Sequence, residues 1–412
     1  MTSQPFAVRL AGDLVGYLQA LGDGRIGFRF VDSYRTMSAR PVLGQKFEDD
    51  LTKTYTGREP AELPAFFANL LPHDKLRAIV VRSLKLNEPT DLELLAAVGT
   101  DLPGAVRLYP TNLDLAELDT SSDAGPHHPA SDDTLGLRFS LAGVQMKFSV
   151  LRGADRFTIP AHGQAGDWIV KVALREYEGL AENEFATLEW ARAAGFDVPQ
   201  CRLVEMSELS ELQRYVDTDA RALVIQRYDR REGGGAIHQE DFAQVIGRQP
   251  QTDGSEKYRF TYEALGFLIK NVVGTDAFDE YVRRLVFVIA TGNNDAHLKN
   301  WSLIYPDRVR PALAPLYDQL ATVAWSTLDR KLALKLTGAR DFGRTDLDSF
   351  ARLASAAQVD EQLVLRNVQE TLQRVREAWP RALASGLPSS HAEAVRLNWS
   401  RVPLLRDHGP IR

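Results

Sequence analysis

Residues 285–305 read LVFVIATGNNDAHLKNWSLIY, an apolar run, a polar loop and a second apolar run in succession. The first run is long enough for a buried helix, and the second has the length and composition of a buried strand. The loop between them gathers Asp295, His297, Lys299 and Asn300. This helix, loop and strand are the most informative segment of the chain, and the remaining segments are interpreted around them.

The spacing inside this loop indicates phosphoryl transfer. Asn300 follows Asp295 by five positions. Kinase catalytic loops have the same interval, and there the aspartate accepts the proton of the substrate hydroxyl while the asparagine binds a metal ion. The segment LAPLYDQLATV at 313–323 then carries Asp318, which we expect at the end of an apolar strand. A carboxylate there can hold magnesium across nucleotide phosphates, because this ion prefers oxygen ligands and needs few from the protein.

An isolated cation lies inside a predicted strand further upstream. Lys171 stands in DWIVKVAL at 167–174, and a lysine buried among apolar residues needs an anionic partner. The next segment, GLAENEFATLEWARAAG at 179–195, predicts a helix with Glu182 and Glu184 near its start. A strand lysine paired with a helix glutamate orients nucleotide phosphates in kinases, and we choose Glu184 as the partner. A snorkelling edge-strand lysine beside a solvated helix end explains this segment equally well.

Two further segments fit a nucleotide site but are less specific. FSLAGVQMKFSVLRG at 139–153 predicts a small-residue turn that leads into a strand, and backbone N–H groups in such a turn can approach phosphate oxygens. ALVIQRY at 222–228 predicts a strand that runs into a glycine-rich loop, as at a hinge between lobes. An adenine ring would contact the backbone there between Ile225 and Tyr228. Each pattern alone also fits an ordinary hairpin or a flexible turn.

The charge distribution argues against a stand-alone nucleic-acid binder and leaves room only for a local basic patch. The chain has 412 residues, of which 44% are hydrophobic and 25% charged, so it is an ordinary globular protein with room for two or three domains. Its net charge of −6 comes from residues 111–133, an acidic linker with six acidic residues and no lysine or arginine. Residues 1–110 hold 13 basic and 13 acidic residues, and residues 134–412 hold 36 of each. Neither part has the basic excess that nucleic-acid binding needs.

The first 110 residues predict a domain of their own. FAVRLAGDLVGYLQ at 6–19 predicts a hairpin around a Gly-Asp turn, IGFRFVDSY at 26–34 a further strand, and DLELLAAVG at 91–99 a helix that ends at its glycine. None of these segments has a catalytic pattern. We therefore interpret residues 1–110 as a docking or scaffolding unit.

The chain shows no signal for export or for membrane insertion. No apolar run of signal-peptide length follows the start, and no stretch of about 18 apolar residues occurs anywhere. The single cysteine, Cys201, cannot form an internal disulfide. We expect a cytoplasmic protein without membrane contact.

Six motifs in order carry a resemblance to a known family. They are FFANLLPHDKLRAIVVRSLKL, LLAAVGTDLPGAVRLYP, SLAGVQMK, HQEDFAQVIG, GNNDAHLKN and APLYDQL. With these motifs the chain resembles the HipA family, bacterial serine/threonine kinases that are the toxins of type II toxin–antitoxin pairs. The resemblance implies an α+β, two-lobed protein-kinase-like fold related to lipid kinases, with an added N-terminal α/β subdomain and a largely helical C-terminal lobe. It divides the chain into an N-terminal subdomain at 1–110, a small lobe with the glycine loop at 134–230 and a helical large lobe with the catalytic loop at 231–412. The acidic linker at 111–133 is a departure, because it matches no motif of the family.

The resemblance also implies ATP and Mg²⁺ as cofactors and roles for individual residues. Asp295 becomes the catalytic base, Lys299 adds positive charge near the transferred phosphoryl group, and Asn300 and Asp318 bind magnesium. The family's autophosphorylated loop serine falls on Ser140, where added negative charge beside the ATP phosphates would be repulsive and switch the enzyme off. The residues expected to contact ATP are Ala142, Gly143, Val144, Gln145, Lys147, Lys171, Gln226, Arg227, Tyr228 and His297.

The implied partners are an aminoacyl-tRNA synthetase as substrate, most often the glutamyl enzyme, and a helix-turn-helix antitoxin of the HipB type. Operator DNA would be bound through the antitoxin, which agrees with the balanced charge of this chain. Two alternatives stay open. One is a kinase of the same architecture that acts on a small molecule or a lipid headgroup, and the other is a catalytically silent scaffold that binds the antitoxin and its DNA. The intact set of Asp295, Asn300 and Asp318 argues against the silent scaffold.

Overall fold

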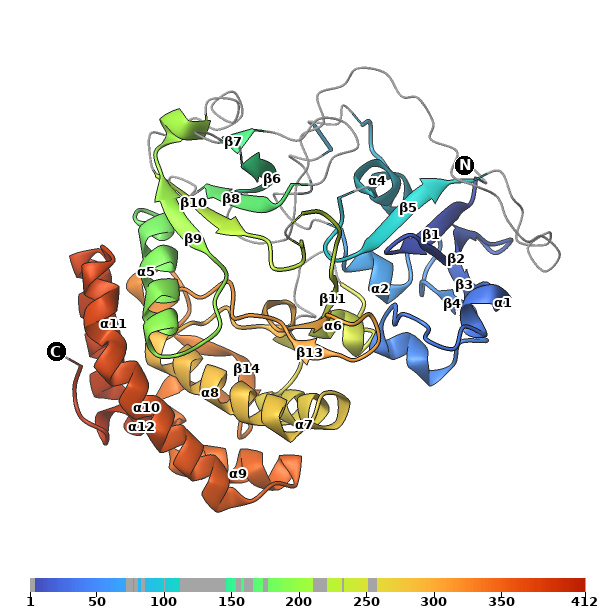
Figure 1. Ribbon diagram of the computed structural model, residues 1–412. Coiled ribbons are helices and arrows are strands. Elements are labelled where there is room, and N and C mark those ends of the chain that lie inside the picture. The colour runs from blue at the N-terminus through green and yellow to red at the C-terminus, as the bar shows by residue number, and fades with distance from the viewer. Residues whose placement is uncertain are drawn as a thin grey trace.

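The computed structural model has α+β architecture (Figure 1). It describes residues 4–71, 77, 81–82, 86–99, 101–111, 146–152, 157–158, 166–172, 177–209, 221–231, 233–250 and 258–411. The acidic linker beyond Thr111 therefore lies outside the described residues, as do Ser140, Ala142, Gly143, Val144 and Gln145 of the glycine loop. Among the helices in the described ranges, none combines the length and the apolar character needed to cross a bilayer.

The N-terminal unit is a five-stranded antiparallel sheet with short helices. Its strands, in the order β4-β3-β2-β1-β5, are β1 (Phe6–Leu10), β2 (Asp13–Ala20), β3 (Ile26–Phe30), β4 (Tyr55–Thr56) and β5 (Val106–Pro110). Its described helices are α1 (Asp32–Arg35), α2 (Ala65–Ala68) and α4 (Asp91–Val98). The predicted hairpin is confirmed, because β1 pairs with β2 across Gly12, whose φ of +97° favours a residue without Cβ. The predicted helix that ends at Gly99 is confirmed as α4, which begins with a capping box between Thr90 and Glu93.

A second five-stranded antiparallel sheet forms the small lobe. Its strands, in the order β7-β6-β8-β10-β9, are β6 (Met146–Arg152), β7 (Phe157–Thr158), β8 (Trp168–Val172), β9 (Cys201–Val204) and β10 (Ala222–Gln226). Helix α5 (Leu180–Ala193) packs against β9 and β10. The strands predicted around Lys171 and at 222–228, and the helix predicted at 179–195, are confirmed by β8, β10 and α5. Apolar residues of β6, β8 and β10 share one hydrophobic cluster with the N-terminal sheet.

The large lobe is mostly helical. Its helices are α6 (Phe242–Val245), α7 (Tyr262–Val272), α8 (Thr275–Thr291), α9 (Leu347–Ala357), α10 (Glu361–Ala384), α11 (Ser389–Arg401) and α12 (Pro403–Arg406). Its strands are β11 (His238–Asp241), β12 (Ser302–Tyr305), β13 (Ala312–Leu313), β14 (Lys331–Leu336) and β15 (Ala339–Asp341). The helix and strand predicted on either side of the polar loop are α8 and β12, and the last turn and a half of α8 is completely buried.

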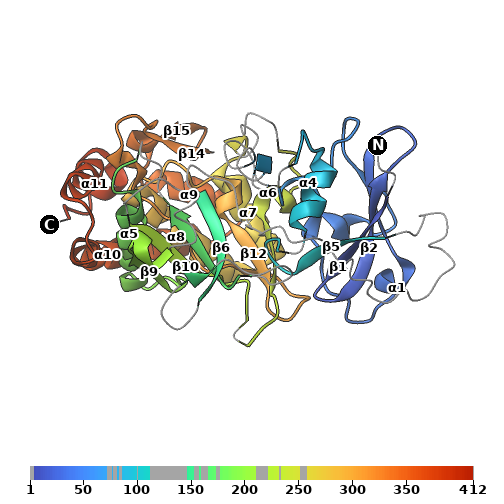
Figure 2. The same cartoon turned by 90° about the horizontal axis from the view of Figure 1, so that it is seen from above.

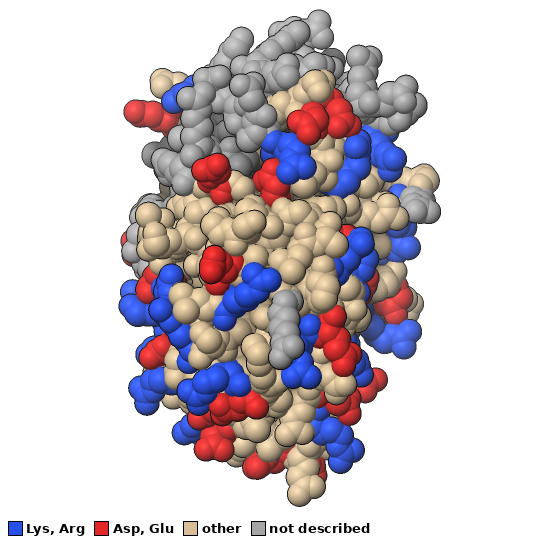
Figure 3. Space-filling model, turned by 90° about the vertical axis from the view of Figure 1, so that its left-hand side faces the viewer, with Lys and Arg blue, Asp and Glu red and all other residues tan. Residues whose placement is uncertain are grey.

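The elements around the polar loop lie between the two ends of the molecule. In Figure 2 the N-terminal sheet lies at one end, α10 and α11 lie at the other, and α6 and β12 lie between them. On the face where α5, α10 and α11 lie, basic and acidic side chains are interspersed (Figure 3). This mixed surface agrees with the balanced charge of residues 134–412.

Candidate active site

The polar loop begins where α8 stops. Gly292 has a φ of +66°, and its amide and that of Asn293 donate back to carbonyls of the last helical turn. A Cβ at Gly292 would lie 2.4 Å from a methyl carbon of Val323, so a larger residue would displace that neighbour. The loop is then fixed around Asp295, whose carbonyl accepts from the His297 amide at 2.7 Å and from the Asn300 side chain at 2.7 Å. The backbone of Asp295 is therefore held in place independently of any ligand.

Two lysines and two carboxylates form a buried cluster beside this loop. Lys147 on β6 and Lys171 on β8 are directly paired across the sheet. The Lys171 ammonium donates to both Glu184 on α5 and Asp318, and Lys147 lies 3.3 Å from Asp318. Glu182, the alternative partner for Lys171, instead accepts from Arg221 at 3.0 Å. We call Lys147, Lys171, Glu184 and Asp318 the lysine cluster.

Burial and charge act in opposite directions on the pKa values of this cluster. Burial raises the pKa of Glu184 and lowers the pKa of Lys147. Burial also opposes charge on Asp318 and Lys171, but the two lysines hold the pKa of Asp318 well below its usual range, and the two carboxylates raise the pKa of Lys171. Asp318 and Lys171 are therefore charged, and a further anion would stabilise the charge on Lys147. Phosphate groups would supply that charge.

The prediction that Asp318 ends an apolar strand is wrong. Strand β13 stops at Leu313, and Asp318 lies five positions later in an irregular segment. Its φ of +57° is in the left-handed region, which aspartate tolerates better than most residues. Strand β13 is a two-residue edge strand that pairs with β12, so the chain has left the sheet before it reaches Asp318. This turn directs the carboxylate toward the two lysines.

A pocket between the lobes collects most of the predicted nucleotide contacts. Its lining includes apolar surface from Ile169 and Ile225 as well as the polar residues. The predicted residues that line it are Lys147, Lys171, Gln226, Arg227, Tyr228, His297, Lys299, Asn300 and Asp318. Its walls thus combine apolar surface that a base could contact with cations that could bind phosphates.

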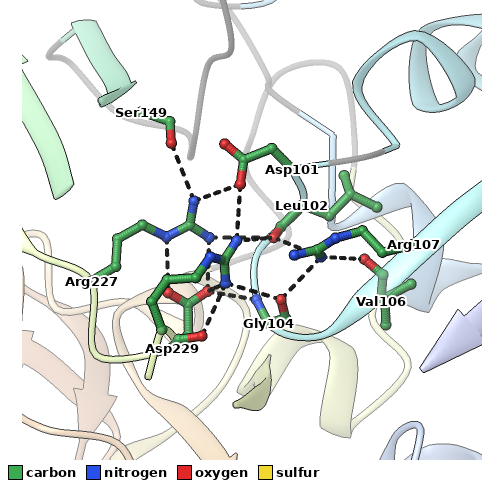
Figure 4. A network of polar contacts seen from close by, with 9 residues as sticks. Asp101, Leu102, Gly104, Val106, Arg107, Ser149, Arg227 and Asp229 are labelled. Atoms are coloured by element: carbon green, nitrogen blue, oxygen red, sulfur yellow. Dashed lines mark hydrogen bonds and ion pairs between the residues drawn. The ribbon is translucent and has the colours of Figure 1, made fainter. Parts of the chain in front are cut away.

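The hinge contributes less of its backbone than the sequence suggests. The Gln226 amide donates to the Gln200 carbonyl at 2.8 Å, and the Arg227 amide to the Asp167 carbonyl at 2.9 Å. These two amides are therefore not available to an adenine ring, and a donor from the hinge must come from Tyr228. The Arg227 guanidinium also points away, into an ionic network with Asp101 and Asp229 (Figure 4).

Sequence reasoning missed the contribution of the N-terminal unit. Asn69, Leu70 and Pro103 line the nucleotide pocket. The Lys299 ammonium donates to the carbonyl and side-chain oxygens of Asn69 at 2.9 and 3.0 Å, and lies 3.4 Å from Asp241. The N-terminal unit therefore holds the catalytic loop, beyond the docking role that we predicted for it. The one signal was that Asn69 lies in a motif shared with the HipA family.

Tyr258 was also missed. Its hydroxyl donates to Asp295 Oδ1 at 2.9 Å, and His297 Nε2 lies 3.6 Å from the same oxygen. No motif in the sequence marks Tyr258, because it precedes α7 and lies 37 positions from its partner.

The donor set fits magnesium bound together with phosphates. Asp318 and Asn300 present a carboxylate and an amide in the same pocket as the two lysines. Within the described part of the chain, no cluster of three or more histidine, cysteine or acidic side chains is placed to hold a metal by itself. Magnesium usually takes one or two protein oxygens and completes its shell with phosphate oxygens and water. Asp318 and Asn300 would serve as these ligands.

Fold and site together define a kinase-like protein. Residues 6–109, which hold all of the N-terminal sheet except its last residue, match the family model for the HipA N-terminal domain, and residues 139–379 match the HipA-like C-terminal domain. The chain belongs to the HipA family.

Named relatives support the same assignment. The chain is 39% identical to the putative kinase Y4dM of Sinorhizobium fredii over 90% of both chains, and 30% identical to the putative kinase Y4mE of that organism over 93% of both. It is 23% identical to the serine/threonine-protein kinase toxin HipA of Shewanella oneidensis over 77% of this chain and 76% of that one. The fold matches HipA in its complex with HipB and operator DNA from that organism, with a TM-score of 0.73 and 19% identity over 98% and 96% of the chains. The protein is a kinase of the HipA type.

Proposed function

We propose that this chain is an ATP- and Mg²⁺-dependent serine/threonine-protein kinase. One observation supports this most strongly. Lys171 joins Glu184 of helix α5 to Asp318, and the pocket that holds this contact also contains Asn300 of the Asp295 loop. Kinases use this combination to orient nucleotide phosphates and to hold a metal.

Each residue has a defined task in the transfer. Lys171 and Lys147 bind phosphate oxygens, and Glu184 orients Lys171. Asp318 and Asn300 hold Mg²⁺, which when bound neutralises charge on the phosphates. Asp295 accepts the proton of the acceptor hydroxyl. Asn69 holds the Lys299 ammonium in the wall of the nucleotide pocket, where it adds positive charge near the transferred phosphoryl group.

We further propose that the protein is the toxin of a type II toxin–antitoxin pair in the cytoplasm. Its substrate would be an aminoacyl-tRNA synthetase, with the glutamyl enzyme as first choice, and phosphorylation would stop translation and growth. Its partner would be a helix-turn-helix antitoxin of the HipB type, which contacts operator DNA. The name of the Shewanella relative and the complex with HipB and DNA support this proposal. Autophosphorylation at Ser140 would switch the kinase off.

The test is the transfer of labelled γ-phosphate from ATP and magnesium to purified aminoacyl-tRNA synthetases, with Asp318→Asn as the blank. We expect label on one synthetase and none in the blank. Label on Ser140 alone would support the kinase and reject synthetases as substrates. Protein that binds ATP, carries no phosphate and labels nothing would reject the kinase proposal.

A further inference from the structure

A second pocket lies on the other side of the lysine cluster. Lys147 and Asp318 line both pockets, and Asp295 lines the second one together with Tyr258. A base that takes a proton from an acceptor hydroxyl must face that acceptor at hydrogen-bond distance. The second pocket is therefore where an acceptor can meet Asp295, while the nucleotide is bound in the first.

Tyr258 already brings a hydroxyl to Asp295, at 2.9 Å. Its ring is held from two sides. Arg340 on β15 lies 5.6 Å from the ring centroid, and the His297 ring meets it edge-on with centroids 5.3 Å apart. The phenol hydroxyl thus occupies the position in which an acceptor hydroxyl would donate to the base.

We propose that the second pocket is the acceptor site and that Tyr258 occupies the place of the acceptor hydroxyl on Asp295 until an acceptor displaces it. This inference rests on the proposed kinase function. In the transfer, the acceptor oxygen forms a bond to the γ-phosphorus while the bond from that phosphorus to the bridging oxygen breaks. The electrons of the broken bond leave with ADP, and the acceptor proton passes to Asp295. Tyr258 makes and breaks no covalent bond.

The walls of the pocket indicate the chemistry of the acceptor. The charged residues that the described structure places in the wall include three of each sign, and Lys331 lies 3.2 Å from Asp329, so they favour neither acidic nor basic flanking residues. They are Lys147, Asp295, Asp318, Asp329, Lys331 and Arg340. The apolar residues of the wall are Tyr177, Leu180, Leu320, Trp325 and Leu328. The pocket therefore suits a polypeptide serine or threonine flanked by large apolar side chains.

The first test uses Tyr258→Phe, which keeps the ring and removes only the hydroxyl. With water as the acceptor, we expect ATP hydrolysis to rise about tenfold, because water no longer competes with a hydrogen bond to a carboxylate. The KM for ATP should not change. Tyr109→Phe, the same substitution on β5 of the N-terminal sheet, should leave hydrolysis unchanged. A lower kcat in Tyr258→Phe would show that Tyr258 positions the base, and would overturn the proposal.

The second test uses two blocked peptides, acetyl-Leu-Ser-Leu-amide and acetyl-Gly-Ser-Gly-amide. We expect the leucine peptide to be phosphorylated at lower concentration, and its KM to fall about tenfold in Tyr258→Phe with kcat unchanged or higher. Equal use of both peptides, or labelling of neither by a Tyr258→Phe enzyme that hydrolyses ATP, would overturn the acceptor assignment. If wild type hydrolyses ATP no faster than Asp295→Asn, the kinase proposal itself fails, and the acceptor proposal fails with it.

Discussion

Two buried ionic networks of matching charge contribute residues to the wall of the nucleotide pocket. Each has two cations and two carboxylates. The first is the lysine cluster, and the second, which we call the arginine network, joins the hinge to the N-terminal unit (Figure 4). The arginine network consists of Asp101, Arg227, Asp229 and Arg230.

The two networks differ in the geometry of their donors. All three guanidinium nitrogens of Arg227 donate, to Asp101, to both oxygens of Asp229 and to the Leu102 carbonyl, at 2.8–3.3 Å. The Gly104 amide also donates to Asp229 at 2.7 Å. Burial opposes charge on Asp229, but the two arginines outweigh it and hold its pKa well below the usual range. The arginine network therefore has a fixed geometry that resists exchange.

The lysine cluster is arranged for exchange. An ammonium is a point charge without a fixed fork, so Lys147 and Lys171 can pass from a carboxylate to a phosphate without rebuilding the site. Burial lowers the pKa of Lys147 because it disfavours the charged ammonium. An incoming anion would stabilise that ammonium and would itself be bound more tightly. The comparison shows that buried charge by itself does not mark a functional site. Donors that can change partners mark it, and a guanidinium whose three nitrogens each donate to a fixed acceptor, as in Arg227, marks a structural joint.

The largest expected effect is the loss of phosphoryl transfer when the lysine cluster is altered. Asp318→Asn removes a proposed magnesium ligand and a partner of both lysines, so we expect phosphoryl transfer to fall at least about 10³-fold, since such an ion contributes several kcal/mol of charge stabilisation. The measurement is ATP turnover at saturating magnesium. A variant that keeps more than a tenth of wild-type turnover would contradict the role of Asp318.

The matching substitution in the arginine network should affect stability and not chemistry. Asp229→Asn leaves Arg227 and Arg230 buried with one carboxylate fewer, and breaking a buried ion pair in this way costs about 3–5 kcal/mol of unfolding free energy. Urea unfolding measures the loss, and kcat is measured at a temperature where the variant stays folded. Unchanged stability, or a kcat that falls as far as in Asp318→Asn, would contradict the assignment of stability to the arginine network and of chemistry to the lysine cluster.

Much of this arrangement follows from local sequence. The switch from apolar to polar to apolar at 285–305 predicts α8, the loop and β12, because each element is decided by neighbours in the chain. The lone cation in β8 and the acidic start of α5 suggest a pair for the same reason. Periodicity could not choose between Glu182 and Glu184, since the choice depends on Arg221, which lies 39 positions from Glu182.

The remaining features depend on contacts distant in the chain. Asn69 reaches Lys299 across 230 positions, and no local pattern marks either residue as a partner of the other. Arg227 was predicted to contact ATP from its place in the hinge, but its side chain belongs to the arginine network. Its partner Asp101 lies 126 positions away on the adjoining unit, so no local pattern could reveal the contact. The placement of Asp318 was wrong, since a strand of two residues gives no periodicity to read.

A smaller effect is expected when the Arg227 guanidinium is replaced by an ammonium. Arg227→Lys keeps the charge, but one ammonium cannot reach Asp101, Asp229 and Leu102 together, so about 1–3 kcal/mol of unfolding free energy should be lost. Because Arg227 lies between Gln226 and Tyr228, we expect the KM for ATP to rise a few-fold with kcat unchanged. Urea unfolding and steady-state kinetics check both. Full retention of stability would mean that the network does not depend on guanidinium geometry.

The smallest effect concerns a buried carboxyl that makes no ion pair with any residue in the described ranges. Glu240 on β11 is fully buried where the large lobe meets the N-terminal unit, and it accepts hydrogen bonds from the Tyr305 hydroxyl and the Gln45 backbone amide. Burial raises its pKa from 4.5 to about 8. Between these values the folded protein keeps a proton that the unfolded chain has lost, so the stability contributed by this group is complete below pH 4.5 and is lost as pH rises toward 8.

Glu240→Gln removes this titration while keeping the shape of the side chain. Relative to wild type, the variant should therefore gain stability steadily from about pH 5 to pH 8, in thermal unfolding measured across that range. Glu393→Gln, at an exposed position of α11, serves as the matched control and should show no such trend. A difference from wild type that stays constant with pH would mean that Glu240 is ionised in the folded state. The contrast with Asp229 would then fail, because a buried carboxylate in this fold would need no arginine to hold its charge.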